Sequence, residues 1–144
     1  MEKKVAVYYR SSIKNDLGTQ AQADLLMRMA RKAGYTDKSM EVFCDNGYSV
    51  LDEERPDFLK LIERAGKSEF GSIYVTDPKR LAGTYKEMKE LLEVLSEQGV
   101  SIYAYDEKSD SMKKVSKRDW PIDMMLSLDI PDNEENTEDD EIDY

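Results

Sequence analysis

The strongest constraint in this sequence is an alternation of short strand-like runs with longer amphipathic segments. Four runs rich in β-branched and aromatic residues lie at 5–9, 40–44, 73–75 and 100–105. Three segments with apolar residues at helical spacing separate them, at 19–33, 56–65 and 84–98. This order is typical of right-handed β-α-β units, in which helices pack on a parallel sheet. We therefore predict an α/β fold with an open, mainly parallel sheet of four to five strands and helices on both faces.

The starts of the three predicted helices carry recognisable signals. Thr19 and Gln22 have the spacing of a capping box at the start of the first helix. Pro56 suits the first position of the second helix, and Thr84 and Glu87 form another capping box before the third. Gln22 therefore has a structural explanation that stands beside any role in a functional site.

Acidic side chains concentrate near the C-terminal end of the chain. The formal net charge is -10, but residues 129–144 hold nine acidic side chains and no basic one, while the other 128 residues hold 22 acids and 21 bases. We expect a folded domain over 1–107, an extension over 108–128 with a short helix starting near Pro121, and a disordered acidic tail over 129–144. The apolar segment 120–128 either packs on its own sheet or forms an interface for a partner.

Composition excludes several kinds of chemistry. The chain has no histidine and a single cysteine, Cys44, so it has no internal disulfide, no zinc site of cysteine and histidine ligands and no catalytic imidazole. No window approaches about 18 consecutive apolar residues, and the first ten residues do not form a secretory leader. We therefore expect a cytoplasmic protein that has no membrane partner.

Polar and charged side chains follow three of the predicted strands at their carboxyl ends, where open α/β sheets bind their ligands. These are Arg10, Ser11 and Ser12 after the first strand, Asp45 after the second, and Asp77, Lys79 and Arg80 after the third. Arg55, just before a helix, adds a further guanidinium group. Such groups present a planar fork of donors that matches phosphate oxygens, which favours a phosphate-containing ligand. No glycine-rich loop follows the first strand, which argues against an enzyme that acts on a small phosphate compound or a nucleotide.

Five separate pieces of the sequence follow one another at a characteristic spacing. They are Tyr8–Ser12, Gln22, Asp45-x-x-x-Ser49, Arg55-Pro56 and Lys79-Arg80-Leu81-Ala82. Together they resemble the catalytic domain of the serine site-specific recombinases, the resolvase and invertase family, over residues 3–107. The resemblance implies a resolvase-like fold with Ser12 as the catalytic nucleophile and with Arg10, Arg55 and Arg80 as catalytic arginines. The supporting residues that it implies are Tyr8, Gln22, Asp45, Ser49 and Lys79.

The resemblance also implies an activity. In that family the serine oxygen attacks a DNA phosphodiester, releases a 3′ hydroxyl and forms a 5′-phosphoserine link, which later rejoins to another strand. Guanidinium groups stabilise the charge on the phosphoryl oxygens, and neither a metal nor another cofactor is required. The implied function is DNA recombination or integration, with DNA as the partner and a homodimer or tetramer as the working assembly.

Three positions depart from the family pattern. Gly83 stands where the family's Asp-Arg-Leu-x-Arg segment has its second arginine, Lys79 stands at the leading aspartate, and Val50 replaces the glycine after Ser49. Removing one donor to a transition state typically lowers a rate by about 10²–10³, so these departures point to a weakened activity. Family members also usually continue into a DNA-binding region, whereas an acidic tail repels DNA phosphates.

Two functions therefore stay open from the sequence. The first is an enzyme that cleaves and rejoins DNA. The second is a non-catalytic module that keeps the fold and regulates a partner recombinase by hetero-oligomerisation, through the segment 120–128 and the acidic tail. Single residues also have simpler interpretations: Arg55 pairs at the surface with Glu53 or Glu54, Asp45 is a turn residue, and Tyr8 and Cys44 only pack.

Overall fold

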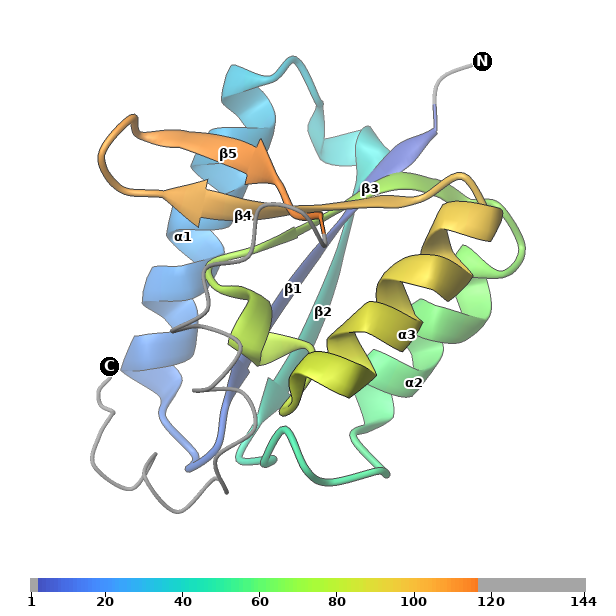
Figure 1. The fold of residues 1–144 in the computed structure, drawn as a ribbon. Helices are drawn as coiled ribbons and strands as arrows, with labels where there is room; N and C mark the ends of the chain where they lie inside the picture. Colours follow the sequence, from blue (N-terminus) through green and yellow to red (C-terminus); the bar gives the residue numbers. More distant parts are fainter. Residues whose placement is uncertain (1–2, 117–144) are drawn as a thin grey trace.

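The computed structural model describes residues 3–116 of the chain. The elements are β1 (Lys4–Ser11), α1 (Asp16–Lys32), β2 (Met40–Asn46), α2 (Pro56–Ala65), β3 (Phe70–Val75), α3 (Tyr85–Glu97), β4 (Ser101–Asp106) and β5 (Ser111–Lys114), with short 3₁₀ helices η1 (Asp37–Ser39) and η2 (Pro78–Arg80). The strands form one sheet in the order β2-β1-β3-β4-β5 (Figure 1). The helix expected near Pro121, the segment 120–128 and the tail 129–144 lie outside the described residues.

The predicted open and mainly parallel sheet is confirmed. The strand β1 pairs in parallel with β2 and with β3, and β3 pairs in parallel with β4. Only β5 runs antiparallel to its neighbour, β4. It lies in the segment 108–128 that the sequence analysis treats as an extension.

Along the part of the chain that the structure describes, no helix is long and apolar enough to cross a bilayer.

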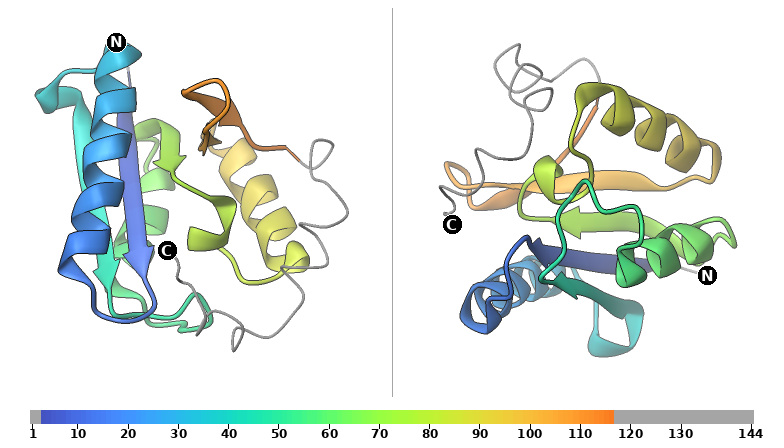
Figure 2. Two further views of the ribbon diagram at one scale, coloured as in Figure 1. Left: turned by 90° about the vertical axis from the view of Figure 1, so that its left-hand side faces the viewer. Right: turned by 90° about the horizontal axis from the view of Figure 1, so that it is seen from below.

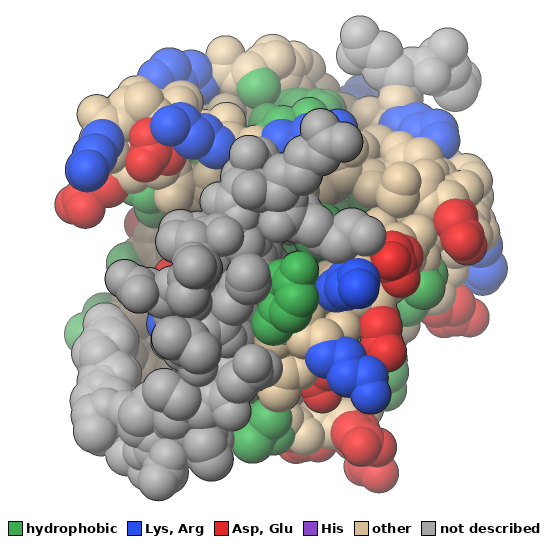
Figure 3. Space-filling view, viewed as in Figure 1, with side chains coloured by type: hydrophobic (Ala, Val, Ile, Leu, Met, Phe, Trp, Pro, Cys, Tyr) green, Lys and Arg blue, Asp and Glu red, His purple; other side chains and the backbone are tan. Residues whose placement is uncertain are grey.

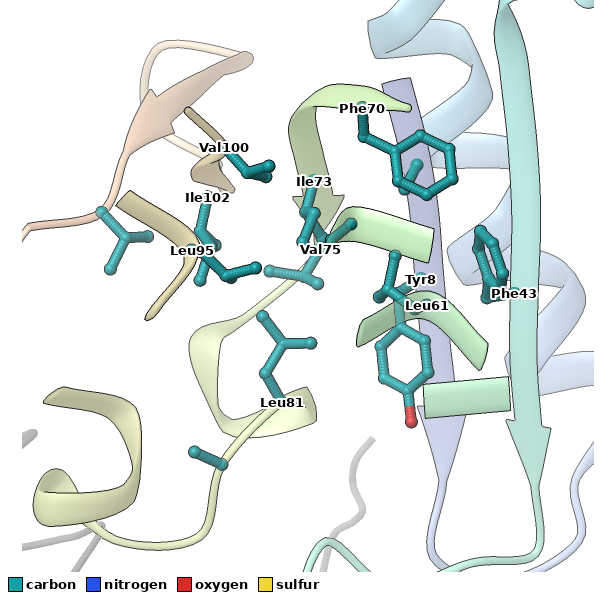
Figure 4. Packing of buried hydrophobic residues seen from close by; sticks show 14 of the residues in the cluster. Tyr8, Phe43, Leu61, Phe70, Ile73, Val75, Leu81, Leu95, Val100 and Ile102 are labelled. Carbon is teal, nitrogen blue, oxygen red and sulfur yellow. The ribbon is translucent and has the colours of Figure 1, made fainter. Parts of the chain in front are cut away.

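Helices cover both faces of the sheet, as predicted. Figures 1 and 2 show α1 on one face and the pair α2 and α3 on the other. Successive side chains of β1 serve the two layers: Val5 and Val7 pack with Leu26 of α1, whereas Ala6 and Tyr8 belong to the cluster under α2 and α3 (Figure 4). Because β1 is buried on both faces, its sequence shows no alternation of apolar and polar residues.

The starts of the helices differ in detail from the predicted capping boxes. The first helix begins at Asp16, and the Asn15 carboxamide oxygen caps it by accepting a hydrogen bond from Gly18 N (2.9 Å). The prediction that Thr19 caps this helix is therefore wrong, because Thr19 lies inside it. At α3 the Thr84 hydroxyl accepts from Glu87 N (3.1 Å), as predicted, but the Glu87 carboxylate accepts from Gly83 N (3.1 Å).

The β4–β5 hairpin is attached to α1 through one carboxylate. Asp110, in the hairpin turn, accepts two hydrogen bonds from Arg28 of α1 (3.0 and 3.2 Å) and one from the Tyr105 hydroxyl (2.7 Å). Its backbone is left-handed (φ 50°), a conformation that aspartate tolerates better than most residues. On the face seen in Figure 3, acidic and basic side chains are interspersed over this hairpin and over α3. The hydrogen bonds of Asp110 with Arg28 and Tyr105 thus fix the edge of the sheet without adding to the functional site.

Candidate active site at the carboxyl ends of β1, β2 and β3

Two buried arginines converge on the short helix η2. Arg10, near the end of β1, is 2% exposed, and Arg55, at the start of α2, is 4% exposed. Arg10 donates from Nη2 to the Lys79 carbonyl and from Nε to the Arg80 carbonyl (both 3.1 Å). Arg55 donates from Nη1 to the same Arg80 carbonyl (3.1 Å) and from Nη2 to the Leu81 carbonyl (2.9 Å). Residues far apart in the sequence are thus joined around one backbone segment.

The Arg80 side chain completes a group of three guanidinium groups. Its Nη1 donates to the Arg10 carbonyl (3.2 Å), two residues before Ser12 along the chain. The Gln22 carboxamide binds both sides of the same residue: Nε2 donates to Arg10 O (2.9 Å) and Oε1 accepts from Arg10 N (3.4 Å). The capping role predicted for Gln22 is wrong, because Gln22 instead holds the end of β1 against α1.

Asp45 and Tyr8 are buried partners of this arginine group. The Tyr8 hydroxyl donates to the Asp45 carboxylate (2.8 Å) and accepts from Arg55 Nη1 (3.2 Å). Asp45 also accepts from the backbone N–H groups of Asp57 and Phe58 (2.9 Å each), at the start of α2. An anion is stabilised there because the first N–H groups of a helix lack partners in the helix. Burial is the main reason why the pKa of Tyr8 lies far above its ordinary value of 10.0.

Two simpler interpretations, a surface ion pair for Arg55 and packing alone for Tyr8, do not match the surroundings of these side chains. Arg55 is buried and forms no ion pair with Glu53 or Glu54 within residues 3–116. Its guanidinium carbon lies 3.9 Å from the centroid of the Phe58 ring, a cation–π contact that the sequence analysis missed. The Tyr8 hydroxyl points away from the apolar cluster, towards the carboxyl end of β1 (Figure 4). Both side chains therefore combine packing with a polar contact at this edge of the sheet.

Ser12 follows β1 directly and is half-buried. The loop after β2 is attached to the residue before it, since Gly47 N and Tyr48 N both donate to Ser11 O (2.8 and 3.0 Å). Arg10 Nη1 in turn donates to Tyr48 O (3.0 Å). Ser12 therefore lies two residues along the chain from Arg10, whose carbonyl accepts from the Arg80 guanidinium group.

Ser49 and Lys79 lie at the rim of this arrangement. The Ser49 hydroxyl accepts from Leu51 N (3.1 Å), in the turn after β2. Lys79 is exposed, and its backbone N–H donates to the Asp77 carboxylate (2.9 Å). The structure thus brings the side chains of six predicted site residues into one hydrogen-bonded group, to which Lys79 contributes its backbone carbonyl: Tyr8, Arg10, Gln22, Asp45, Arg55 and Arg80.

The two positions without the expected glycine and arginine touch each other in space. A β-carbon added at Gly83 would lie 3.1 Å from Val50 Cγ1 and 2.9 Å from Leu51 Cδ2. Val50 is buried, at 6% exposure. The valine thus occupies the space into which a side chain at position 83 would extend.

Two guanidinium donors of the site are unused. Within residues 3–116 the buried Nε atoms of Arg55 and Arg80 have no hydrogen-bond partner, and neither does the Thr76 hydroxyl. Buried charged donors without acceptors are rare in folded proteins. An oxyanion is the ligand that such donors favour. Residues 3–116 also include no group of three carboxylate or thiol side chains suited to a metal ion.

Fold and site together define a class of protein: an α/β domain that gathers arginines at the carboxyl ends of parallel strands. The chain belongs to the resolvase N-terminal domain family, whose model matches residues 5–126. The family and the fold implied by the sequence resemblance are thereby confirmed. No curated protein is significantly similar to the chain.

Several solved structures are similar to this one. The N-terminal catalytic domain of TP901-1 integrase is 25% identical, with a TM-score of 0.64, over 71% of this chain and 77% of that chain. The catalytic domain of ISC1926 TnpA, an IS607-like serine recombinase, is 25% identical, with a TM-score of 0.62, over 70% and 69%. A resolvase family site-specific recombinase from Streptococcus pneumoniae shares the fold at 18% identity, with a TM-score of 0.62, over 88% and 83%.

Proposed function

We propose that this chain is a serine recombinase catalytic domain that cleaves DNA through Ser12. The Ser12 oxygen attacks a DNA phosphorus atom, the bond from phosphorus to the 3′ oxygen breaks, and the serine proton passes to solvent while the 3′ oxygen gains one. The products are a 5′-phosphoserine link and a 3′ hydroxyl, and the reverse reaction rejoins a strand. Storing the phosphodiester in a covalent intermediate divides one difficult exchange into two easier steps.

The observation that carries the proposal is the convergence of Arg10, Arg55 and Arg80 at the carboxyl end of β1, the strand that Ser12 follows. Guanidinium groups stabilise the charge that collects on phosphoryl oxygens in the transition state. The Nε atoms of Arg55 and Arg80 have no hydrogen-bond partner within residues 3–116 and are available for that purpose. Tyr8 and Asp45 orient Arg55, and Gln22 orients the end of β1. Membership of the resolvase family and likeness to serine recombinase domains support the same activity.

Strand exchange between two DNA sites requires four cuts. The proposal therefore includes two dimers that pair into a tetramer, with one Ser12 for each cut strand. We also propose that the protein acts inside the cell, where DNA is found. Light scattering of the full chain with and without DNA measures the assembly.

The test is to look for a nucleotide on Ser12. The full chain is incubated with supercoiled plasmids that carry a randomised insert, the DNA is digested with nucleases, and the peptide containing residue 12 is weighed by mass spectrometry. We expect Ser12 to carry a 5′-linked nucleotide in the native chain and in Ser11→Ala, which removes the neighbouring hydroxyl, but not in Ser12→Ala. A linked nucleotide that persists in Ser12→Ala, or none in the native chain, contradicts the proposal.

A second function has one specific observation in its favour. Val50 and Leu51 lie against Gly83, so a side chain at this position of a family arginine would require these neighbours to move. This favours a non-catalytic module that binds and regulates an active recombinase. In that case the native chain forms no adduct but co-purifies with a recombinase from the same genetic element and changes the rate at which that recombinase cleaves DNA.

A further inference from the structure

Three consecutive backbone carbonyls receive the guanidinium groups of Arg10 and Arg55. The carbonyls of Lys79, Arg80 and Leu81 accept four hydrogen bonds between them, at 2.9–3.1 Å. Three neighbouring carbonyl oxygens thus accept hydrogen bonds from two cations, the kind of donor that also binds phosphate oxygens. The side-chain donors of Arg10 and the two Nη atoms of Arg55 are therefore already bound by the protein itself, while Arg55 Nε and Arg80 Nε stay unused within residues 3–116.

These acceptors are weaker than the proposed ligand. A carbonyl is neutral, whereas a phosphodiester carries a full negative charge, so Coulomb attraction to the guanidinium groups is added when the phosphodiester is the acceptor. Arg55 forms no ion pair within residues 3–116, so its carbonyl acceptors are not reinforced there by a carboxylate in direct contact. A phosphate that reaches the site would thus displace carbonyls from the guanidinium groups.

We infer that the Lys79–Leu81 carbonyls form an internal latch, which occupies Arg10 and Arg55 until a DNA phosphate replaces it. The inference rests on the proposed function and adds a regulatory step to it. The apparent affinity for DNA is lowered by the fraction of molecules in which the latch is closed. In the absence of DNA, the closed latch therefore protects the arginines from binding phosphate groups indiscriminately.

The latch opens by rotation of peptide groups. Leu81 and Ala82 are buried in the core, at 1% and 4% exposure, so the segment cannot leave as a whole. Each carbonyl shares a peptide plane with the N–H group of the next residue. The N–H groups of Arg80, Leu81 and Ala82 donate to Asp77 O (2.9 Å) and twice to Pro78 O (3.0 and 3.4 Å). Turning these planes away from the guanidinium groups breaks those three N–H bonds as well.

Hydrogen exchange at these three amides tests the latch. The full chain carrying Ser12→Ala, which blocks covalent chemistry, is studied by NMR with and without a nicked DNA duplex, and binding is followed in parallel by fluorescence anisotropy. We expect exchange at residues 80–82 to become faster when DNA binds, although binding usually slows exchange. The amide of Glu87, bonded to the Thr84 hydroxyl at the start of α3, serves as an internal control whose exchange stays unchanged.

A pair of variants tests the latch from the other direction. The Asp77 carboxylate accepts from Lys79 N (2.9 Å) and caps η2. Asp77→Asn removes the charge but keeps an acceptor, whereas Asp77→Ala removes both, so comparing them separates the cap from the charge. We expect Asp77→Ala to bind the duplex more tightly than Asp77→Asn, by up to about fivefold, the effect of one cap. Thr84→Ala, which removes the cap of α3, leaves the affinity unchanged.

The outcomes separate the latch from the proposed function. Faster exchange at 80–82 on DNA binding, together with tighter binding by Asp77→Ala, supports the latch. DNA binding with unchanged or slower exchange at these amides, or equal affinities of the two Asp77 variants, overturns the latch and leaves the Ser12 adduct as an independent result. A chain that neither binds DNA nor forms the adduct overturns both.

Discussion

Asp45 is the buried acceptor on which the order of the arginine group depends. It is 1% exposed and accepts hydrogen bonds from the Tyr8 hydroxyl and from the N–H groups of Asp57 and Phe58. In Asp45→Ala the hydroxyl and the two helix N–H groups lose their acceptor. The substitution also removes the negative charge that is linked to the buried Arg55 through the Tyr8 hydroxyl.

The size of the effect follows from these contacts. A hydrogen bond to a charged group contributes about 1.5–3 kcal/mol, and removing one partner from a buried ionic arrangement costs about 3–5 kcal/mol. The three bonds do not add fully, because they share one carboxylate and water can enter the space left by it. We expect Asp45→Ala to lower the free energy of unfolding by about 3–5 kcal/mol, a large fraction of the total for a small domain.

Urea unfolding followed by circular dichroism measures this loss. Asp52→Ala is the matched control, because the Asp52 carboxylate also accepts a backbone N–H bond (Glu54, 2.8 Å) but is exposed. The control should lose less than about 1 kcal/mol. Tyr8→Phe, which removes a single hydroxyl, should lose about 1–2 kcal/mol. Equal losses in Asp45→Ala and Asp52→Ala would refute the view that Asp45 organises the buried network.

Three further predictions concern other parts of the molecule. Gly83→Arg should lower the free energy of unfolding by about 1–3 kcal/mol through overpacking against Val50, and adding Val50→Gly should restore part of it in a double-mutant cycle by urea unfolding. Hydrogen bonds from Arg28 and Tyr105 lower the pKa of Asp110 to about 2 from 3.8. The hairpin anchor is therefore complete above about pH 4 and lost as the pH falls towards 2, which hydrogen exchange of residues 106–111 should record, with no such change in Asp110→Asn. Burial raises the pKa of Cys44 to about 11, so iodoacetamide should alkylate it at pH 8 at least about tenfold more slowly than a free cysteine, and an equal rate would show an exposed thiol.

The backbone of this protein was largely predictable because its layers leave local patterns. A strand covered on both faces, such as β1, is continuously apolar, and amphipathic helices repeat their apolar residues at 3.6-residue spacing. The strand β5 escaped prediction because only one of its four residues, Met112, is strongly apolar. It is held by pairing with β4 and by the contact of Asp110 with Arg28, which lies 82 residues away in the sequence. Local patterns cannot report such a contact.

That the candidate residues gather at one edge of the sheet was predictable, but the hydrogen bonds between them were not. The rule that ligands bind beyond the carboxyl ends of parallel strands brought Arg10, Asp45 and Arg80 to one edge. The sequence did not reveal that the guanidinium groups bind backbone carbonyls, since every residue has a carbonyl and only the fold selects three of them. For Gln22 the spacing from Thr19 fits a capping box and the family resemblance implies a supporting role in the site; in the structure Asn15 caps the helix and Gln22 binds Arg10.

The same arginines stabilise the fold and are proposed to act on DNA. A substitution at Arg55 and one at Arg80 therefore differ in how well they separate a loss of activity from a loss of stability. Arg55 is buried and forms three hydrogen bonds, and a lysine lacks the planar fork that reaches all three acceptors. Loss of activity in Arg55→Lys would therefore be accompanied by loss of stability. Arg80 is half-buried, and within residues 3–116 its side chain forms one hydrogen bond, to the Arg10 carbonyl. Arg80→Ala should thus lower the free energy of unfolding by only about 1 kcal/mol while abolishing the Ser12 adduct. If both variants lose stability equally, the arginine group is a structural feature, and the case for phosphoryl chemistry rests on Ser12 alone.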